Sequence, residues 1–181
     1  MIYRRIVDLI KRDPERLAAS WCHHIKRSQV TGNYHRLSDD ELIARHTQVF
    51  TRLAKWLEHS MTRDELSRFY AQLGKDRYAE RFPLCQVNYA LLIAKRNFWE
   101  LIQSQGLLDS SLEFYQAMEL MSSIDQFFDL GSFYIVRGYL DAMSNRLQKS
   151  GRLTDEELRD VLFRPDPHSH PELQESVKAQ R

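Results

Sequence analysis

The sequence is short of the features that mark secreted, membrane-spanning and disulfide-linked proteins. Its two cysteines, Cys22 and Cys85, stand in neither a CxxC nor a Cys/His zinc spacing, which favours buried thiols in a reducing compartment. Charges at positions 4, 5, 8 and 11 break the apolar core that a signal peptide would need. No run of about 18 apolar residues occurs either. We therefore expect a cytoplasmic protein that does not span a membrane.

An excess of charge of either sign is absent as well. Twenty-six basic residues stand against 25 acidic ones, for a net charge of +1, so no long-range field draws the chain to nucleic acid or to an anionic membrane. The sequence also lacks a basic helical stripe that could follow phosphates. We expect neither nucleic acid nor a membrane as a partner.

Catalytic and metal-binding signatures are missing too. No GxSxG, P-loop or GxGxxG segment occurs. Residues 60–167 contain no histidine, and no glutamate has a histidine three residues later. These gaps exclude the Glu-x-x-His pairs of di-iron bundles and the usual proximal histidine of a globin. We expect no cofactor. The alternative is a globin-like gas sensor whose haem takes another histidine as axial ligand: His23, His24, His46 or His59.

What the sequence does contain is clear helix punctuation. Its composition, 43% hydrophobic and 28% charged with six glycines, is that of a globular protein rich in helix formers, and no segment alternates with the period of a strand. Asp13-Pro14 marks a helix start, and Ser38 to Glu41 and Thr62 to Glu65 are capping boxes. The predicted fold class is all-α: a single-domain helical bundle, of which a globin-like arrangement is one form, with a long C-terminal helix.

The last long helix and the segment after it complete the expected organisation. The N-terminal segment should form a helix with Ile2, Ile6, Leu9 and Ile10 on one face. Further helices are predicted from 14, over 39–59, over 62–81, over 83–106 and over 109–149, with a loop at 28–36. The last would measure roughly 57 Å if straight, so we expect a bend near Gly131 or Gly138, where helix propensity is lowest. A short helix ending near Phe163 would close the domain, 1–163. Residues 164–181 have too few apolar side chains to pack and should be disordered.

Polar side chains interrupt the apolar stripes of the fourth, fifth and sixth predicted helices. Counted at about 100° per residue, the fifth helix places Asn88 and Lys95 on its stripe, and the sixth places Asp125 and Ser132 there. The stripe of the fourth helix continues onto Arg77. A charge that faces the interior costs several kcal/mol unless it is paired, so these side chains should meet one another or a ligand. The apolar stripe of the sixth helix comprises Phe114, Met118, Met121, Ile124, Phe128, Ile135 and Tyr139.

Three interpretations are open for these polar residues. In the first, Asp125 pairs with Lys95 or Arg77 as a structural ion pair. In the second, a small pocket among the fourth to sixth helices holds an anion or a metabolite, and its filling shifts the sixth helix. In the third, Asp125 and Lys95 are catalytic groups with shifted pKa values. The candidate pocket residues are Arg77, Asn88, Lys95, Asp125 and Ser132.

Two segments combine packing and turn signals, "LAASWCHHIKRSQVTGNYHRLSDDELIARHTQVFTRLAKWL" and "LGKDRYAERFPLCQVNYALLIAKRNFWELI". The signals are Trp21, the LSDDEL cap, Leu73-Gly74-Lys75 with Arg77, Pro83-Leu84, and Arg96 with Trp99. In these signals the chain, over roughly residues 14–145, resembles the N-terminal sensor domain of RsbRD-type RsbT co-antagonists.

The resemblance implies an all-helical, commonly dimeric sensor of stress-response signalling that lacks haem and passes its signal through the last long helix. Family members usually carry a phosphoacceptor STAS domain after the sensor, for which the roughly 30 residues after position 150 are too few. We therefore expect a non-enzymatic sensory or regulatory domain that stands alone or receives its output from a partner. Its expected partners are a second copy, a regulatory protein and a small-molecule ligand.

Overall fold

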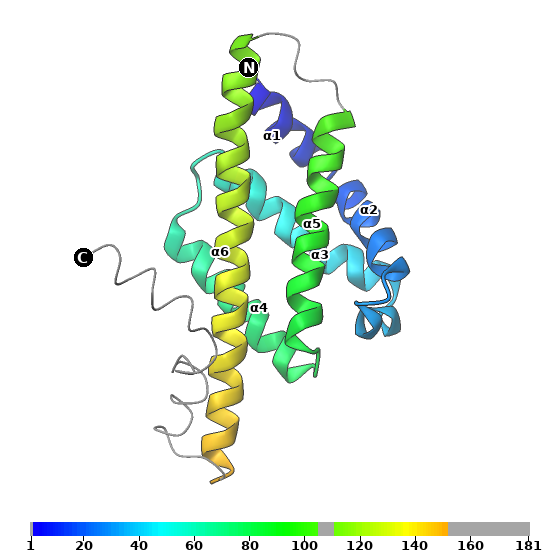
Figure 1. Ribbon diagram of the computed structural model, residues 1–181, viewed down its shortest axis with the longest axis vertical. Coiled ribbons are helices and arrows are strands. Elements are labelled where there is room, and N and C mark those ends of the chain that lie inside the picture. Colours follow the sequence, from blue (N-terminus) through cyan, green and yellow to red (C-terminus); the bar gives the residue numbers. More distant parts are fainter. Residues whose placement is uncertain (1, 105–110, 152–181) are drawn as a thin grey trace, which may run out of the picture. The chain divides into compact units, whose positions relative to one another are not determined.

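The computed structural model describes residues 2–104 and 111–151, which form six α-helices and one short 3₁₀ helix (Figure 1). No strand occurs among these described residues, so the all-α prediction is confirmed. The elements are α1 (Ile2–Arg12), α2 (Pro14–Arg27), η1 (Gly32–Arg36), α3 (Asp39–Leu57), α4 (Arg63–Ala79), α5 (Leu84–Ser104) and α6 (Ser111–Lys149).

The chain divides into two compact units, Met1–Ala142 and Met143–Arg181, so that the second begins inside α6. The core and every contact described below belong to the first unit. The predicted helix ending near Phe163 and the boundary between residues 1–163 and 164–181 lie outside the described residues. Within the described ranges, no helix is both long and apolar enough to cross a membrane.

Local capping fixes where α2, α3 and α4 begin. The Asp13 side chain accepts a 3.0 Å hydrogen bond from a backbone amide in the first turn of α2. Ser38 with Glu41, and Thr62 with Glu65, form reciprocal capping boxes. Each box satisfies amide groups that the helix itself leaves unpaired. The three predicted starts are confirmed.

Both α3 and α4 end two residues earlier than the sequence indicates, at turns built on left-handed residues, His59 (φ 55°) and Arg81 (φ 61°). After α4, the Arg81 amide donates to the Tyr78 carbonyl at 3.0 Å, and the Phe82 amide donates to the Arg77 carbonyl at 2.9 Å. This is the Schellman pattern, which usually contains glycine. Neither His59 nor Arg81 is a glycine, so the usual sequence signal for a helix end is missing at both turns. The predicted loop at 28–36 likewise contains η1.

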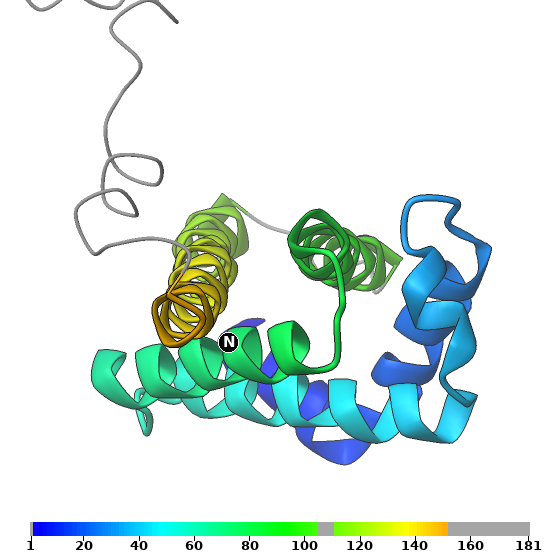
Figure 2. The ribbon, with the colours of Figure 1, turned by 90° about the horizontal axis from the view of Figure 1, so that it is seen from below.

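Within the first unit, α5 and α6 run side by side, and α3 and α4 lie across them as a second layer (Figure 2). Aromatic side chains fill the space between. Those less than 2% exposed or close to it are Phe50, Tyr70, Phe82, Phe98, Phe127 and Phe128. Of the two thiols expected to be buried, Cys22 is buried but Cys85 is exposed, and both are free.

The buried stripe of α6 is narrower than the sequence indicates. Met118 and Met121, predicted to face the core, are 53% and 45% exposed. Leu120, Ile124 and Phe127 occupy the buried side at this level. The physical reason is that only one side of this half of α6 is covered by neighbouring helices, so the stripe spans fewer residues than the apolar pattern suggested.

Glycines bring α4 and α6 into backbone contact. A Cβ added at Gly138 would lie 2.0 Å from the Ala71 carbonyl oxygen, and one at Gly74 would lie 2.2 Å from the Ile135 carbonyl oxygen. Gly131 also leaves no room for a Cβ. Meanwhile α6 runs as one unbroken helix through both of its glycines (Figure 1). The expected bend is therefore wrong: these glycines allow close packing of two helices.

Candidate functional site

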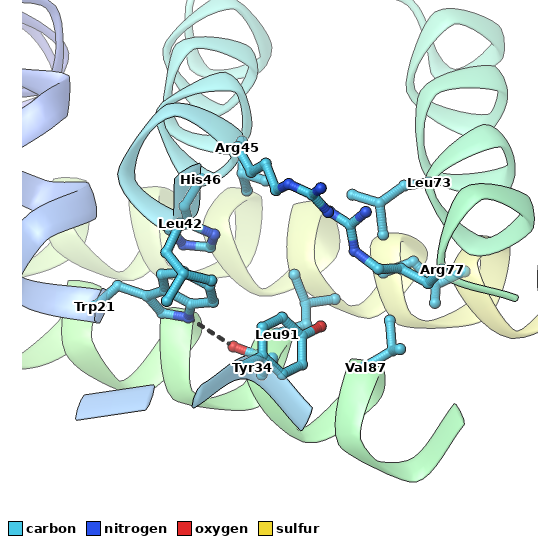
Figure 3. Close-up of a pocket in the computed structure, with 12 residues that line it drawn as sticks. Trp21, Tyr34, Leu42, Arg45, His46, Leu73, Arg77, Val87 and Leu91 are labelled. Carbon is cyan, nitrogen blue, oxygen red and sulfur yellow. Dashed lines mark hydrogen bonds between the residues drawn. The ribbon is translucent and has the colours of Figure 1, made fainter. Parts of the chain in front are cut away.

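The first unit contains a partly open cavity of about 40 Å³ bounded by α2, η1 and α3 to α6 (Figure 3). Most of its wall is aliphatic, from leucine, valine, alanine and isoleucine side chains. The side chains that bring polar atoms to it are Trp21, Tyr34, Arg45, His46 and Arg77. A cavity of mixed lining with a few convergent polar groups is the usual form of a small-ligand site.

His46 and Trp21 form the inner wall of this cavity. Their rings stack with centroids 3.8 Å apart and planes 7° from parallel. The Trp21 indole donates a 2.9 Å hydrogen bond to the Ala90 carbonyl oxygen, which ties α2 to α5 (Figure 3). His46 is buried, and its Nε2 atom has no hydrogen-bond partner among the residues that the structure describes. A buried polar atom without a partner is unusual and calls for a reason.

The charge states of the buried ring groups follow from burial. Burial, with the nearby positive charge of Arg77, lowers the pKa of His46 to about 3, so the imidazole is neutral at physiological pH. Burial also raises the pKa of Tyr34 to about 12, although Arg77 opposes that change. The inner cavity therefore holds neutral hydrogen-bonding groups, and positive charge stands only at its mouth.

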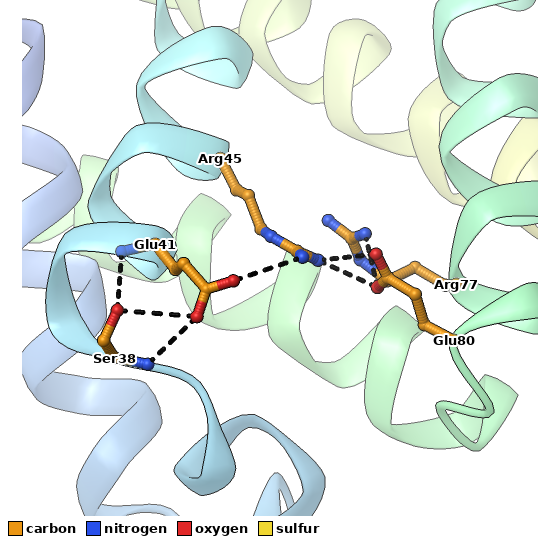
Figure 4. Close-up of polar contacts among 5 residues, drawn as sticks. All are labelled: Ser38, Glu41, Arg45, Arg77 and Glu80. Atoms are coloured by element: carbon orange, nitrogen blue, oxygen red, sulfur yellow. Dashed lines mark hydrogen bonds and ion pairs between the residues drawn. The ribbon is translucent and has the colours of Figure 1, made fainter.

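The mouth of the cavity is formed by two arginines that share one carboxylate (Figure 4). Arg45 on α3 donates to both oxygens of Glu80, at 3.0 and 2.8 Å, and Arg77 on α4 donates to Glu80 Oε2 at 2.9 Å. Glu41 lies 3.7 Å from Arg45 and also closes the capping box with Ser38. Glu80 is thus the carboxylate that holds the two guanidinium groups together.

Outside the mouth lies an open groove of about 420 Å³ along α3 and α4. It shares Arg45, Leu73 and Arg77 with the cavity, and Glu80 also lines it. The groove is polar apart from Phe69 and Leu73. A side chain that left the mouth would therefore enter a space accessible to water.

The five residues predicted to share one pocket fall into three separate contacts. Arg77 lies at the cavity mouth. Asn88 on α5 accepts a 2.6 Å hydrogen bond from the Ser132 hydroxyl on α6. Lys95 on α5 forms 3.0 Å ion pairs with Asp125 and with Asp129 on α6. Of the five, only Arg77 lines the cavity or the groove, and a ligand pocket formed by all of them stays a prediction.

The Lys95 cluster has the character of a structural ion network. Burial acts to lower the pKa of Lys95, but the hydrogen bonds and charges of Asp129 and Asp125 outweigh it and leave the pKa raised. An amine with a raised pKa stays protonated at neutral pH and cannot act as a base or a nucleophile. The Asp125 and Asp129 side chains are 42% and 71% exposed. The geometry favours the structural interpretation over the catalytic one.

The four histidines named for the haem alternative do not converge. His23 is exposed beside Arg27, and His59 is exposed in the turn after α3. Of the four, only His46 lines the described cavity, whose 40 Å³ is far below the roughly 300 Å³ or more of pockets for larger cofactors and ligands. The residues described also contain no group of three or more His, Cys, Asp and Glu that could hold a metal ion.

Residues 15–154 match the protein-family description "RsbT co-antagonist protein rsbRD N-terminal domain". No curated protein and no solved structure gives a significant match. The family match covers most of the 181 residues and extends from α2 through α6. The chain therefore belongs to the family of RsbT co-antagonist rsbRD N-terminal domains, a family of stressosome-type sensory and regulatory domains rather than enzymes.

Proposed function

We propose that this chain is a cytoplasmic, non-enzymatic regulatory domain that passes a signal to a protein partner through α6. The observation that carries the proposal is the backbone contact of α4 with α6 at Gly74 and Gly138. Two packed surfaces without intervening side chains have few alternative arrangements, so a shift of one helix is passed to the other rather than absorbed.

The C-terminal end of α4 connects the candidate site to this contact. Arg77 belongs to the last turn of α4 and lies at the cavity mouth. The next residue, Tyr78, packs edge-on against Tyr139 of α6 with ring centroids 5.2 Å apart. The Tyr139 hydroxyl donates a 2.7 Å hydrogen bond to the Phe82 carbonyl in the turn after α4. A change at the mouth therefore has a short physical route to α6.

Removing the Glu80 carboxylate, which bridges the two arginines, should make backbone amides of α6 exchange faster. In Glu80→Ala, the two arginines lose their shared partner and the last turn of α4 loosens, so we expect hydrogen exchange of amides in residues 132–142 to become several-fold faster. Hydrogen–deuterium exchange with mass spectrometry measures this directly.

The matched control for that experiment is Lys11→Ala, which removes another cross-helix ion pair, the one with Glu58 between α1 and the end of α3. It should leave exchange in 132–142 unchanged. If Glu80→Ala speeds exchange around Arg45 and Arg77 but not in α6, the proposed transmission is wrong.

We further propose that the domain acts as a homodimer that uses the uncovered side of α6. Large apolar side chains are exposed there and on the adjoining α5: Leu92 at 51%, Met118 at 53%, Met121 at 45% and Phe133 at 58%. Exposed apolar groups gathered on neighbouring helices are typical of association surfaces. The family likeness supports a dimer, and the choice of surface rests on these exposed side chains.

The dimer can be tested by light scattering over a range of concentrations. The wild-type chain should be dimeric. In the double variant Met118→Ser with Phe133→Ser, the dissociation constant of the dimer should rise at least about tenfold, since each substitution removes apolar area buried in the dimer. Val30→Ser, at an equally exposed apolar residue outside α5 and α6, should behave as the wild type. A wild-type chain that is monomeric at every concentration would rule the dimer out.

A further inference from the structure

We propose that the Arg45–Arg77 mouth and the cavity behind it bind a short-chain organic carboxylate, and that Glu80 occupies the carboxylate position when no ligand is bound. The inference rests on the proposed regulatory function and names the ligand class of its signal. Of the five candidate pocket residues named from the sequence, only Arg77 belongs to this site.

The two guanidinium groups are arranged as a carboxylate receptor. They come from different helices, α3 and α4, and converge on one carboxylate through three hydrogen bonds of 2.8 to 3.0 Å. Arginine forks match the planar carboxylate in geometry and in charge, and such charge-assisted bonds are stronger than neutral ones. A site that holds the Glu80 carboxylate in this way has the chemistry to hold another.

Glu80 is a replaceable occupant because its own position is unfavourable. It is the C-cap of α4, where the negative end of the helix dipole opposes a carboxylate. The Glu80 side chain can swing into the open groove of about 420 Å³ that it already lines.

The cavity sets the size of the ligand. Its 40 Å³ exceeds the roughly 10 to 15 Å³ of cavity volume that one water molecule needs but is well below the roughly 150 Å³ of a cavity that accepts benzene. A ligand with its carboxylate between Arg45 and Arg77 therefore has room for only a short carbon chain inward. The aliphatic wall and the Trp21 ring suit such a chain.

The unpartnered His46 Nε2 atom indicates which group the ligand carries beside its carboxylate. His46 lines the cavity and is only 6% exposed, and its Nε2 atom has no hydrogen-bond partner in the described part of the chain. A neutral imidazole nitrogen can donate to a keto oxygen or accept from a hydroxyl, depending on its tautomer. Short 2-oxo and 2-hydroxy carboxylates have such an oxygen beside the carboxylate, and binding one would satisfy the buried nitrogen.

Titration calorimetry on the full chain tests the site, with pyruvate, lactate and acetate as probes in buffers of matched ionic strength. We expect saturable binding of pyruvate or lactate, weaker binding of acetate, and about tenfold tighter binding by Glu80→Gln because the competing carboxylate is removed. Arg77→Met should weaken binding by at least about tenfold. Arg96→Met, which removes an arginine from the exposed Arg96–Glu100 pair on α5, should bind as the wild type does.

Inorganic phosphate and sulfate are the discriminating probes. If they bind as well as pyruvate and compete with it, the site is a general anion site and the carboxylate assignment is overturned. If no probe binds the wild type or Glu80→Gln, the site itself is overturned. The proposed function fails separately, when a carboxylate binds but exchange in residues 132–142 stays unchanged.

Discussion

Replacing Gly138 by alanine should lower the free energy of unfolding by about 3 kcal/mol or more. A Cβ at this position would lie 2.0 Å from the Ala71 carbonyl oxygen and 2.6 Å from its carbon, closer than any real contact. The obstacle is backbone, which cannot rotate away as a side chain can, so α4 and α6 must separate. Overpacking of a rigid contact costs about 1 to 3 kcal/mol and occasionally more. Urea denaturation followed by circular dichroism measures the loss.

The sign of this effect is diagnostic. In an open helix, alanine is favoured over glycine by about 1 kcal/mol, so a glycine that served only to soften α6 would give a stabilised variant. Gly32→Ala is the control, because no atom of the described residues lies within 4 Å of a Cβ placed there, and the stability of this variant should differ from the wild type by less than about 0.5 kcal/mol. Unchanged or increased stability of Gly138→Ala would mean that the helices do not meet at this point.

The same glycines show what the sequence could and could not predict. Low helix propensity is a local property, so the pattern suggested a bend at Gly131 or Gly138. Small size matters only when another helix approaches, and that approach depends on residues about sixty positions earlier, Ala71 and Gly74. Local signals placed the starts of α2, α3 and α4 correctly because an N-cap or a capping box acts within four residues. The packing of α4 against α6 has no comparable local signal in the sequence.

Only part of the candidate site was predicted, because the polar residues assigned to apolar stripes all came from the fourth to sixth helices. His46 lies on the buried stripe of α3, four residues after Leu42 and three before Val49, so helical spacing does mark it as a polar side chain that faces the core. The pairing of Arg45 with Glu80, 35 residues apart, had no such signal. It depends on how α3 and the end of α4 approach one another.

The stability of the domain should fall steeply with moderate acid because of His46. Burial lowers its pKa from an ordinary value of 6.5 to about 3 in the folded chain, so the unfolded chain binds a proton between these values and the folded chain does not. Stability contributed by the neutral ring is thus fully present above about pH 6.5 and is lost progressively as the pH falls toward 3. The loss should reach about 2 kcal/mol at about pH 5, relative to about pH 7.5.

His46→Phe isolates this contribution, because phenylalanine keeps a ring that can stack on Trp21 but cannot take up a proton. Urea denaturation of both chains over about pH 5 to 7.5 avoids most carboxylate titration, and the remaining histidines are common to both. The difference in unfolding free energy between wild type and variant should shift by about 2 kcal/mol across this range. If the unfolding free energies of the two chains change with pH in the same way, the His46 ring is charged or reaches water in the folded state. In that case the Nε2 atom no longer supports a hydrogen bond to a ligand.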